Sequence, residues 1–430
     1  LSVRASVETP VLDSPGRTAQ ERTSNEAGEL LLATARAGRS SVGGSGPGGA
    51  VPPRPTDRQA WTRAAWVEVD LAAVRGNARL LAAAVDPARL LAVVKADAYG
   101  HGALPVARAA LEGGATHLGV ALAEEGVELR RGGIEAPILV LAEPPPAAAG
   151  AVVAGQLTPV VYTPAGVAAL AAAVRRGGAE PLPVHLKVDT GMHRVGCSPG
   201  DVVRLAVLVA NQPELRLEGL LTHLAVADAP SDPYTARQLS LLHEAAEALR
   251  EAGLGRPLLH AANSAATLSL PGSHLDLVRC GIALYGLAPA PCLEGRLPLR
   301  PVLSLRARIV YVKKLAAGER LSYGRRYELR SDARVATVPL GYADGVPRRL
   351  GEVGGEVLVG GRRRRIAGTV TMDQLLVDLG DDPVGAGEEV VLLGRQGEET
   401  MGAAEWAERL DTIPYEILCG ISARVPRHYV

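Results

Sequence analysis

Residues 90–102 read Leu-Leu-Ala-Val-Val-Lys-Ala-Asp-Ala-Tyr-Gly-His-Gly, a short apolar run followed by a polar, glycine-containing loop. An apolar run of this length between loop residues is typical of a fully buried strand in a parallel sheet. In an α/β barrel, the chemistry lies at the C-terminal ends of such strands. Lys95, which ends the run, is therefore a candidate catalytic residue, although a lysine at a strand end can also extend its ammonium group into water.

From Trp66 onward the chain alternates between strand-like and helix-like segments. The strand-like segments end near eight positions: Lys95, Ala121, Leu141, Val161, Val188, Thr222, His260 and Cys280. The helix-like segments include one that begins after Asp70, a plausible N-cap, and others at 104–112, 123–131, 165–176 and 233–252. Eight such units in about 200 residues predict a closed (β/α)8 TIM-like barrel rather than an open sheet.

The segments on either side of the barrel have a different character. Residues 1–62 are rich in Ser, Gly and Pro and have no aromatic residue before Trp61, which predicts a disordered extension without chemistry. We assign 63–300 to the barrel, although a first strand at about 66–70 could pair with the domain that follows. Residues 301–430 contain segments in which apolar and polar residues alternate with period two, separated by Gly-rich turns. This pattern predicts a mainly antiparallel β domain.

Composition excludes several classes of protein. The 430 residues include 46 basic and 46 acidic side chains, and this balance argues against a nucleic-acid-binding protein. The run of four arginines at 362–365 is therefore interpreted as a solvated hairpin. Four cysteines, with neither disulfide nor metal-ligand spacing, indicate reduced thiols, no metal site and a cytoplasmic location. No apolar run is long enough to span a bilayer, so no membrane association is expected.

Residues that could bind a ligand lie at the C-terminal ends of five predicted strands. Most are polar: Lys95 and Tyr99, then Lys187, Asp189 and Arg194, then His223, then Asn263 and Ser264, and finally Arg279, which is followed by the backbone of Gly281 and Ile282. Barrels commonly bind phosphate with the loops after strands seven and eight. The Ser264 hydroxyl and the backbone at Gly281 suit that use, since a glycine permits close approach. A phosphate site beside a lysine suggests pyridoxal 5'-phosphate held as a Schiff base.

Between about Trp66 and Pro426 the chain carries a series of motifs that resemble those of the alanine racemase family and occur in the same order. The matching segments are 93–102, 187–194, 222–223, 260–264, 279–282, 321–324, 341–345, 372–374 and 415–416. The resemblance implies interconversion of L- and D-alanine by two-base proton transfer on a pyridoxal phosphate aldimine. It also implies a homodimer with active sites shared between subunits, and a supply of D-alanine for cell-wall peptidoglycan.

The resemblance also implies roles for single residues. Lys95 resembles the lysine that holds the cofactor and acts as one acid/base, and Tyr323 resembles the opposite base, supplied by the second subunit. Arg279 is similar to the arginine at the pyridine nitrogen, with His223 linking it towards Tyr323. Arg194 is similar to the arginine that contacts the cofactor's phenolic oxygen and the substrate carboxylate.

The remaining matches concern the rest of the pocket. Residues that match the family's phosphate-binding and other cofactor-binding positions are Tyr99, Asn263, Ser264, Gly281, Ile282 and Tyr415. Tyr342 and Met372 match the substrate-pocket positions, and Lys187 matches a lysine that is often carbamylated. Three positions depart from many or some relatives: Cys280, Thr371 and Ala423. None of them removes a catalytic group, but the substrate preference stays open in detail.

Three other functions stay open at this point. A broader amino-acid racemase acting on serine would use the same residues. A non-catalytic pyridoxal phosphate carrier is disfavoured because such single-barrel proteins lack a β domain with Tyr323, Met372 and Tyr415. A barrel-type decarboxylase is disfavoured by Arg279. An arginine does not release its proton, so the pyridine nitrogen of the cofactor stays unprotonated and the ring withdraws electrons only weakly. His260 is interpreted as a core histidine and Asp344 as a turn residue.

Overall fold

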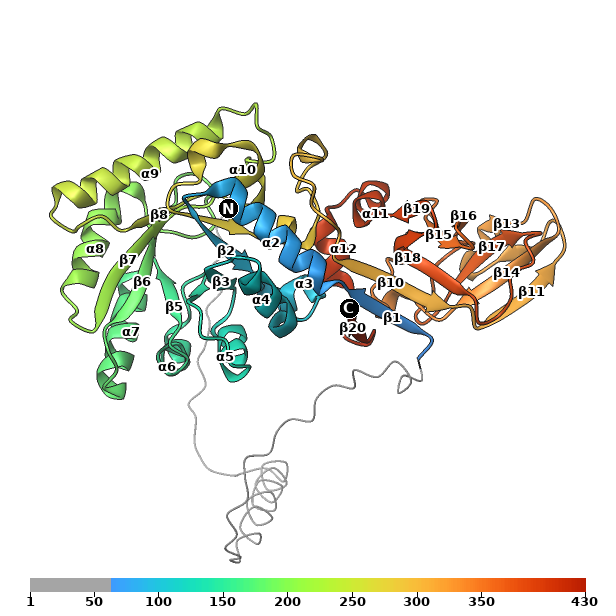
Figure 1. Cartoon of the computed structure of the whole chain (residues 1–430), viewed down its shortest axis with the longest axis horizontal. Coiled ribbons are helices and arrows are strands. Elements are labelled where there is room, and N and C mark those ends of the chain that lie inside the picture. The colour runs from blue at the N-terminus through green and yellow to red at the C-terminus, as the bar shows by residue number, and fades with distance from the viewer. Residues whose placement is uncertain (1–62) are drawn as a thin grey trace, which may run out of the picture. The chain divides into compact units, whose positions relative to one another are not determined.

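The computed structural model describes residues 63–430 (Figure 1). The prediction of a disordered extension concerns residues 1–62, which lie outside this range. The described residues form a parallel barrel followed by antiparallel sheets, as the sequence predicts.

Eight parallel strands follow one another in the order β8-β7-β6-β5-β4-β3-β2-β9. Their bounds are β2 Arg89–Val93, β3 His117–Val120, β4 Ile138–Val140, β5 Thr158–Val161, β6 Leu182–Lys187, β7 Leu215–Leu221, β8 Leu258–His260 and β9 Leu277–Cys280. Backbone hydrogen bonds from Asp276 to Leu259 (3.0 Å) and from Arg279 to Ala262 (2.9 Å) join the two ends of this order. All eight strands end within two residues of the positions predicted from the sequence.

Helices cover the outside of the barrel (Figure 1). They are α2 Leu71–Val85, α4 Ala103–Glu112, α5 Ala123–Arg131, α6 Ala149–Ala154, α7 Pro164–Gly177, α8 Val202–Ala210, α9 Tyr234–Glu251 and the short α10 Ser264–Ser269. Asp70 is the N-cap of α2, because its carboxylate accepts a hydrogen bond from the Ala73 amide at 2.7 Å. Each long helix turns an apolar face inward, with Val74 and Leu81 of α2 fully buried.

The remaining strands form three sheets. The largest has the order β16-β15-β18-β10-β1-β20, with β19 beside β18, and the others are β11-β14-β17 and β12-β13. The bounds are β1 Ala65–Val69, β10 Leu303–Arg308, β11 Tyr311–Leu315, β12 Arg320–Leu321, β13 Tyr327–Glu328, β14 Ala333–Val338, β15 Glu356–Val359, β16 Arg362–Arg365, β17 Leu375–Gly380, β18 Glu389–Gln396, β19 Glu399–Met401 and β20 Arg427–Tyr429. Helices α11 (Ala403–Leu410) and α12 (Pro414–Gly420) complete the domain. Strand β1 pairs with β10 and β20, so the first described strand belongs to this C-terminal sheet.

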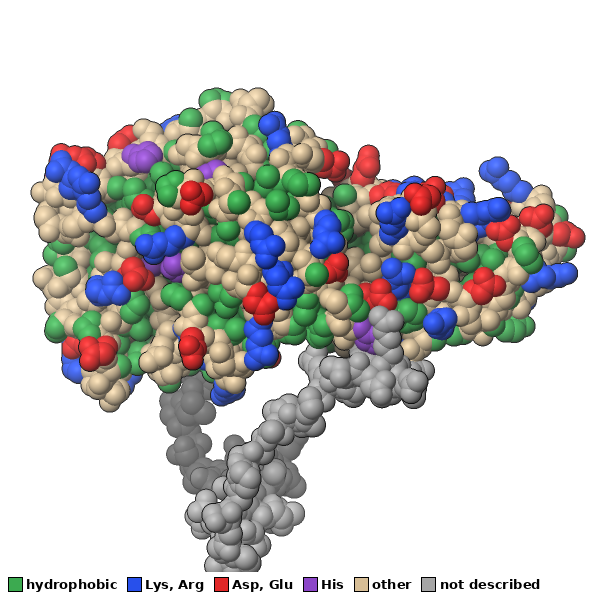
Figure 2. Space-filling view, viewed as in Figure 1, with side chains coloured by type: hydrophobic (Ala, Val, Ile, Leu, Met, Phe, Trp, Pro, Cys, Tyr) green, Lys and Arg blue, Asp and Glu red, His purple; other side chains and the backbone are tan. Residues whose placement is uncertain are grey.

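The four consecutive arginines form strand β16, which pairs with β15. Arg363 is bonded to Glu399 and Glu405, and the guanidinium group of Arg364 contacts Asp382. Arg362 also contacts Asp382, at 3.4 Å. The prediction of a solvated hairpin is therefore incomplete, since three of these arginines have carboxylate partners. On the face drawn in Figure 2, basic and acidic side chains are interspersed, in keeping with the zero net charge.

Candidate active site

A cavity of about 350 Å³ lies at the C-terminal ends of the barrel strands. Eleven of the residues singled out in the sequence line it: Lys95, Tyr99, Lys187, Arg194, His223, Asn263, Ser264, Arg279, Gly281, Ile282 and Tyr415. Tyr415 comes from α12, and all the others come from the barrel. Lys95 and Tyr415, which are 320 positions apart in the chain, thus face one space. This is the usual arrangement of a ligand site in a barrel.

Three predicted residues lie elsewhere. Tyr323, Tyr342 and Met372 belong to the β domain and do not line this cavity. Their side chains are 71%, 42% and 53% exposed. Tyr323 lies in the turn between β12 and β13 and is the most exposed of the three.

The segment directly after Lys95 is a left-handed turn. The four residues Ala96, Asp97, Ala98 and Tyr99 have φ values of 52°, 51°, 55° and 54°. A left-handed conformation costs roughly 1–2 kcal/mol for each residue with a Cβ atom. Four in succession persist only where the surroundings hold them, and such strain is characteristic of functional sites.

Side chains around this turn supply the restraint. The Glu125 carboxylate accepts a hydrogen bond from the Ala96 amide at 2.6 Å, and the Asp97 carboxylate accepts one from the Ala103 amide at 2.7 Å. Nδ1 of the fully buried His101 lies 2.9 Å from the Ala98 carbonyl oxygen. Burial lowers the pKa of His101 to about 4, so the imidazole is neutral and Nδ1 carries the hydrogen it donates.

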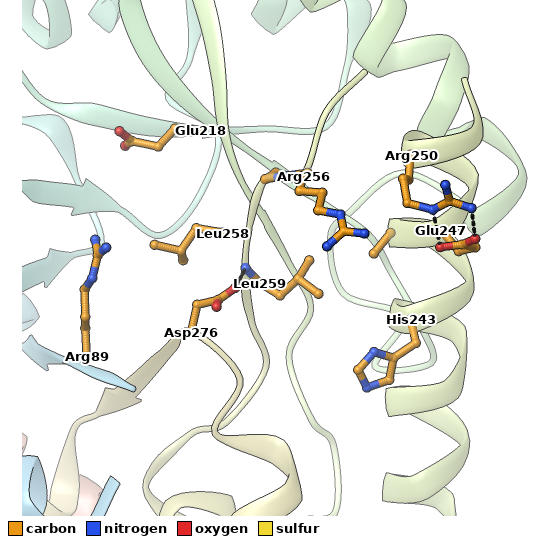
Figure 3. Close-up of a pocket in the computed structure, with 11 residues that line it drawn as sticks. Arg89, Glu218, His243, Glu247, Arg250, Arg256, Leu258, Leu259 and Asp276 are labelled. Carbon is orange, nitrogen blue, oxygen red and sulfur yellow. Dashed lines mark hydrogen bonds and ion pairs between the residues drawn. The ribbon is translucent and has the colours of Figure 1, made fainter. Parts of the chain in front are cut away.

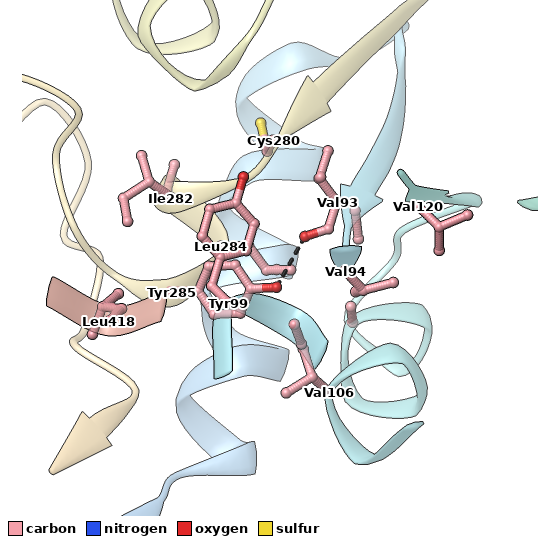
Figure 4. Close-up of a cluster of buried hydrophobic side chains, with 14 of the residues drawn as sticks. Val93, Val94, Tyr99, Val106, Val120, Cys280, Ile282, Leu284, Tyr285 and Leu418 are labelled. Atoms are coloured by element: carbon pink, nitrogen blue, oxygen red, sulfur yellow. Dashed lines mark hydrogen bonds between the residues drawn. The ribbon is translucent and has the colours of Figure 1, made fainter. Parts of the chain in front are cut away.

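A second tyrosine, Tyr285, contacts both the turn and the strand before it (Figure 4). The Tyr285 hydroxyl donates a hydrogen bond to the Val93 carbonyl oxygen at 2.9 Å. Its ring packs against that of Tyr99 with 4.8 Å between the centroids. No role for Tyr285 or His101 could be predicted from the sequence, although His101 lies in the matching segment 93–102, because their hydrogen bonds depend on the fold.

Neutral hydrogen-bond donors surround one end of the cavity. The Ser264 oxygen accepts hydrogen bonds from the amides of Gly281 (2.9 Å) and Ala283 (3.3 Å), so its own hydrogen is free to be donated to a ligand. A Cβ atom at Gly281 would overlap the hydroxyl of Tyr99. Burial raises the pKa of both Tyr99 and Tyr415, which keeps the two phenols protonated. This end of the cavity therefore suits a phosphate group, since it offers several donors and requires glycine at its rim.

Arg279 is buried without a carboxylate partner. Only 5% exposed, its guanidinium donates to the carbonyl oxygens of Thr222 (2.8 Å) and Ala261 (2.9 Å). Two imidazoles complete its contacts: Nδ1 of His260 at 3.0 Å and Nδ1 of His223 at 3.3 Å. Burial lowers its pKa to about 10, so the group stays cationic at neutral pH. Arg279 is therefore not part of a surface ion pair, and some of its N–H groups remain free to donate to a group in the cavity.

The two histidines beside Arg279 are neutral. Burial, and then the charge of Arg279, lowers the pKa of both His223 and His260 well below the ordinary value. Arg279 and His223 are in contact at 3.3 Å, whereas the onward link from His223 towards Tyr323 stays a prediction. His260 is fully buried, in line with its interpretation as a core histidine, yet its partner is the arginine of the site.

Several cations share the cavity. Lys187 is 6% exposed, and burial, together with Arg279 and Arg194, lowers its pKa to about 8. Lys95 lines the same space. The site therefore attracts anions such as a phosphate or a carboxylate.

Asp344 is more than the turn residue predicted from the sequence. It lies in the short turn Tyr342–Asp344 and is fully buried. Its carboxylate contacts Arg63 at 2.6 Å and Arg424 at 3.6 Å, and Arg424 also contacts Asp373 at 2.8 Å. This ion-pair cluster holds the two loops that carry Tyr342 and Met372.

Two kinds of feature are absent from residues 63–430. No helix in this range is both long and apolar enough to cross a membrane. The same residues contain no group of three or more His, Cys, Asp or Glu side chains placed to hold a metal ion.

The fold and the site define an α/β-barrel enzyme with a C-terminal β domain and a cationic pocket at the barrel rim. Residues 69–289 match the family described as "Alanine racemase, N-terminal domain", and residues 302–429 match "Alanine racemase, C-terminal domain". The chain belongs to the alanine racemase family and is an isomerase.

Individual relatives are similar along almost their whole length. An alanine racemase of Symbiobacterium thermophilum is 50% identical over 368 residues, which cover 85% of this chain and 97% of the relative. The alanine racemase of Streptomyces coelicolor has a TM-score of 0.82 at 42% identity, covering 87% of this chain and 100% of that structure. The Bacillus anthracis enzyme, solved with bound L-Ala-P, has a TM-score of 0.81 at 40% identity, covering 86% and 96%.

Proposed function

We propose that the protein interconverts L- and D-alanine with pyridoxal 5'-phosphate bound in the 350 Å³ cavity, and that it is active as a homodimer. The observation that carries this proposal is the buried Arg279, which lacks a carboxylate partner and lines the same cavity as Lys95. The product D-alanine would serve cell-wall peptidoglycan synthesis in the cytoplasm. The four free cysteines agree with a reducing compartment.

The residues present fit the cofactor. Lys95 would hold it covalently, and Arg279 would donate a hydrogen bond to its ring nitrogen. The hydroxyls of Tyr99, Ser264 and Tyr415, with the amide of Ile282, would bind its phosphate, and Gly281 would permit its close approach. Asn263 caps α10 through a hydrogen bond from the Ala266 amide at 3.1 Å and thereby holds Ser264 in place. When bound, pyridoxal phosphate withdraws electrons from the α-carbon of an attached amino acid and makes its hydrogen acidic.

Racemisation requires acid/base groups on opposite faces of the α-carbon. Lys95 supplies one. Tyr99 and Tyr415 are poor candidates for the other, because burial raises the pKa of each phenol. The exposed Tyr323 is suited to this role only if it reaches the cavity of another chain. We therefore propose that Tyr323 of one subunit completes the site of the other, together with Tyr342 and Met372 as substrate-pocket residues.

Arg279 would also limit side reactions. A guanidinium donates hydrogen bonds and does not release its proton, so a ring nitrogen beside it stays unprotonated. The resulting weak electron withdrawal favours proton transfer at the α-carbon over decarboxylation. Arg194, at the exposed edge of the cavity, would bind the substrate carboxylate and the phenolic oxygen of the cofactor.

Alanine is the favoured substrate over serine. The three relatives described above all carry the name alanine racemase, and no observation favours a serine racemase. A direct test is to incubate purified protein with L-alanine or L-serine, with and without added pyridoxal phosphate, and to measure the D-enantiomer. We expect cofactor-dependent formation of D-alanine and a much lower rate with L-serine. Failure to form D-alanine with the cofactor bound would refute the proposal.

A further inference from the structure

A line of side chains crosses the barrel interior from Arg279 to the opposite end. Nδ1 of His260 lies 3.0 Å from Arg279, and Nε2 of His260 lies 2.9 Å from Nδ1 of His185. Nε2 of His185 lies 3.4 Å from a carboxylate oxygen of Glu218. Both imidazoles are buried, at 0% and 3% exposure, whereas Glu218 is partly exposed. We call these four residues the Arg279–Glu218 chain.

The two ends of the chain determine where its hydrogens lie. Arg279 can only donate, so Nδ1 of His260 must accept and its hydrogen must be on Nε2. That hydrogen is donated to Nδ1 of His185, whose own hydrogen must then be on Nε2. The ionised Glu218 can only accept it, and the hydrogen bond from His185 is the largest influence lowering its pKa, to about 2. With both histidines neutral, each of the three hydrogen bonds has one donor and one acceptor. All three bonds donate in the direction from Arg279 to Glu218.

The barrel has room for this chain because of a glycine. Gly219 of β7 lies opposite His185 of β6, and a Cβ atom at Gly219 would overlap the His185 ring. His185 thus occupies space that any other residue at 219 would fill. The position of His185 is set by packing as well as by its two hydrogen bonds.

We propose that His185 and Glu218 are positioning residues for Arg279, because they hold His260 in the one tautomer that can accept from the guanidinium. The inference rests on the proposed function in one respect: it takes Arg279 as the group that meets the cofactor's ring nitrogen. Without the Glu218 carboxylate, the His185 hydrogen loses its acceptor and can move to Nδ1. His260 can then place its hydrogen on Nδ1, and Arg279 loses the one acceptor that holds its Nη1 group, although its contacts to Thr222 and Ala261 remain.

The far end of the chain opens to solvent. Glu218 lines a second cavity of about 820 Å³ at the N-terminal ends of the strands, together with Arg89, Asp276 and Glu247 (Figure 3). Glu247 is paired with Arg250 and has no part in the chain. Glu247→Leu is therefore a matched control for Glu218→Leu, since both remove a carboxylate from the same opening.

The first test needs neither cofactor nor turnover. Nitrogen NMR of ¹⁵N-histidine-labelled protein without cofactor reports which ring nitrogen of each imidazole carries hydrogen. Signals of His185 and His260 are assigned by their loss in the variants His185→Phe and His260→Phe. We expect both residues as the neutral Nε2–H tautomer, with a change at His260 in Glu218→Leu and none in Glu247→Leu. The proposal is overturned if the wild-type signals show His260 protonated or with its hydrogen on Nδ1. It is also overturned if the His260 signals are the same in Glu218→Leu and in wild type.

The second test uses the loaded enzyme. We expect Glu218→Leu to lower kcat for alanine about tenfold with KM within about twofold, the size typical of residues that orient a functional group from outside. Glu218→Gln, which keeps an acceptor oxygen, should recover most of that loss, and Glu247→Leu should leave kcat unchanged. Equal kcat in Glu218→Leu and wild type overturns the proposal.

If Glu218→Leu does not fold, His185→Phe takes its place. Absence of racemisation in the wild type would refute the proposed function, while the NMR result would still decide the tautomers.

Discussion

At the residue scale, the charge of Lys187 affects the net charge of the cavity and the position of Arg194. As an ammonium group it would add to the charges of Arg194, Arg279 and Lys95. Burial and these neighbours lower its pKa to about 8, so an appreciable fraction is the neutral, nucleophilic amine near that pH. An amine that adds CO2 and releases a proton becomes a carbamate, and the cation is replaced by an anion that can pair with Arg194.

This reasoning predicts carbamylation of Lys187. Protein equilibrated with ¹³C-labelled bicarbonate should show a carbamate carbon signal, and Lys187→Gln should lack it while keeping the fold. The anion should also hold Arg194 for the substrate carboxylate, so Lys187→Gln should raise KM for alanine. A carbamate signal that survives in Lys187→Gln would place the modification on a different lysine.

His101 gives a residue-scale prediction about pH. Its pKa in the folded protein is about 4, below the value of 6.5 that is usual for an unperturbed histidine. Between these values the unfolded chain binds the proton that the folded protein rejects, so stability falls as pH decreases from 6.5 and is unaffected above it. Each such group contributes a slope of up to about 1.4 kcal/mol per pH unit. The buried His223 and His260 act in the same direction.

The measurement is the denaturation midpoint between pH 6.5 and 5, above the range where ordinary carboxylates titrate. We expect a fall in stability with decreasing pH, and a shallower fall in His101→Asn, whose amide can still donate to the Ala98 carbonyl. His243→Asn, which changes a histidine lining the opposite end of the barrel, is the control. An identical pH dependence in wild type and His101→Asn would contradict the assignment.

At the scale of elements, the left-handed turn after Lys95 depends on one carboxylate of α5. Glu125 accepts hydrogen bonds from the amides of Ala96 (2.6 Å), Ala121 (2.8 Å) and Leu122 (3.1 Å). It therefore joins the ends of β2 and β3 and restrains the strained segment. Glu128, on the same helix, is exposed and belongs to the solvent face.

Glu125→Ala should destabilise the protein by about 1–3 kcal/mol, because three amides lose their acceptor. Amide hydrogen exchange at residues 96–99 should become faster, since the turn would relax towards right-handed or extended backbone. Glu128→Ala should change neither quantity. Unchanged exchange at 96–99 in Glu125→Ala would mean that the turn is held by Asp97 and His101 alone.

The eight strands and most helices could be predicted from the sequence because apolar runs and helical periodicity are local signals. The left-handed turn could not, since Ala96, Asp97 and Ala98 have no intrinsic preference for positive φ and adopt it through contacts with Glu125 and His101. The link between His260 and His185 could not be predicted either. These histidines lie on different strands, with β7 between them, and meet only once the barrel closes.

At the scale of the whole molecule, one chain does not bring its predicted bases together. Lys95 lines the cavity, whereas Tyr323 is 71% exposed and absent from its lining. A symmetric dimer resolves this, because a closed two-fold arrangement lets each chain contribute a residue to the site of the other. An enzyme built in this way requires association for activity.

Subunit complementation tests this arrangement. Lys95→Ala and Tyr323→Phe should each be inactive alone: the first loses the cofactor link that borohydride traps, and the second keeps the link but slows racemisation by about 10²–10⁴. In a mixed dimer, Lys95 of the Tyr323→Phe chain meets the intact Tyr323 of the other chain, so one of two sites is complete. Random exchange makes half of the dimers mixed, so activity should recover to about one quarter of wild type. A mixture that stays inactive after proven subunit exchange would place both bases in one chain, since each variant would then lack a complete site in every dimer.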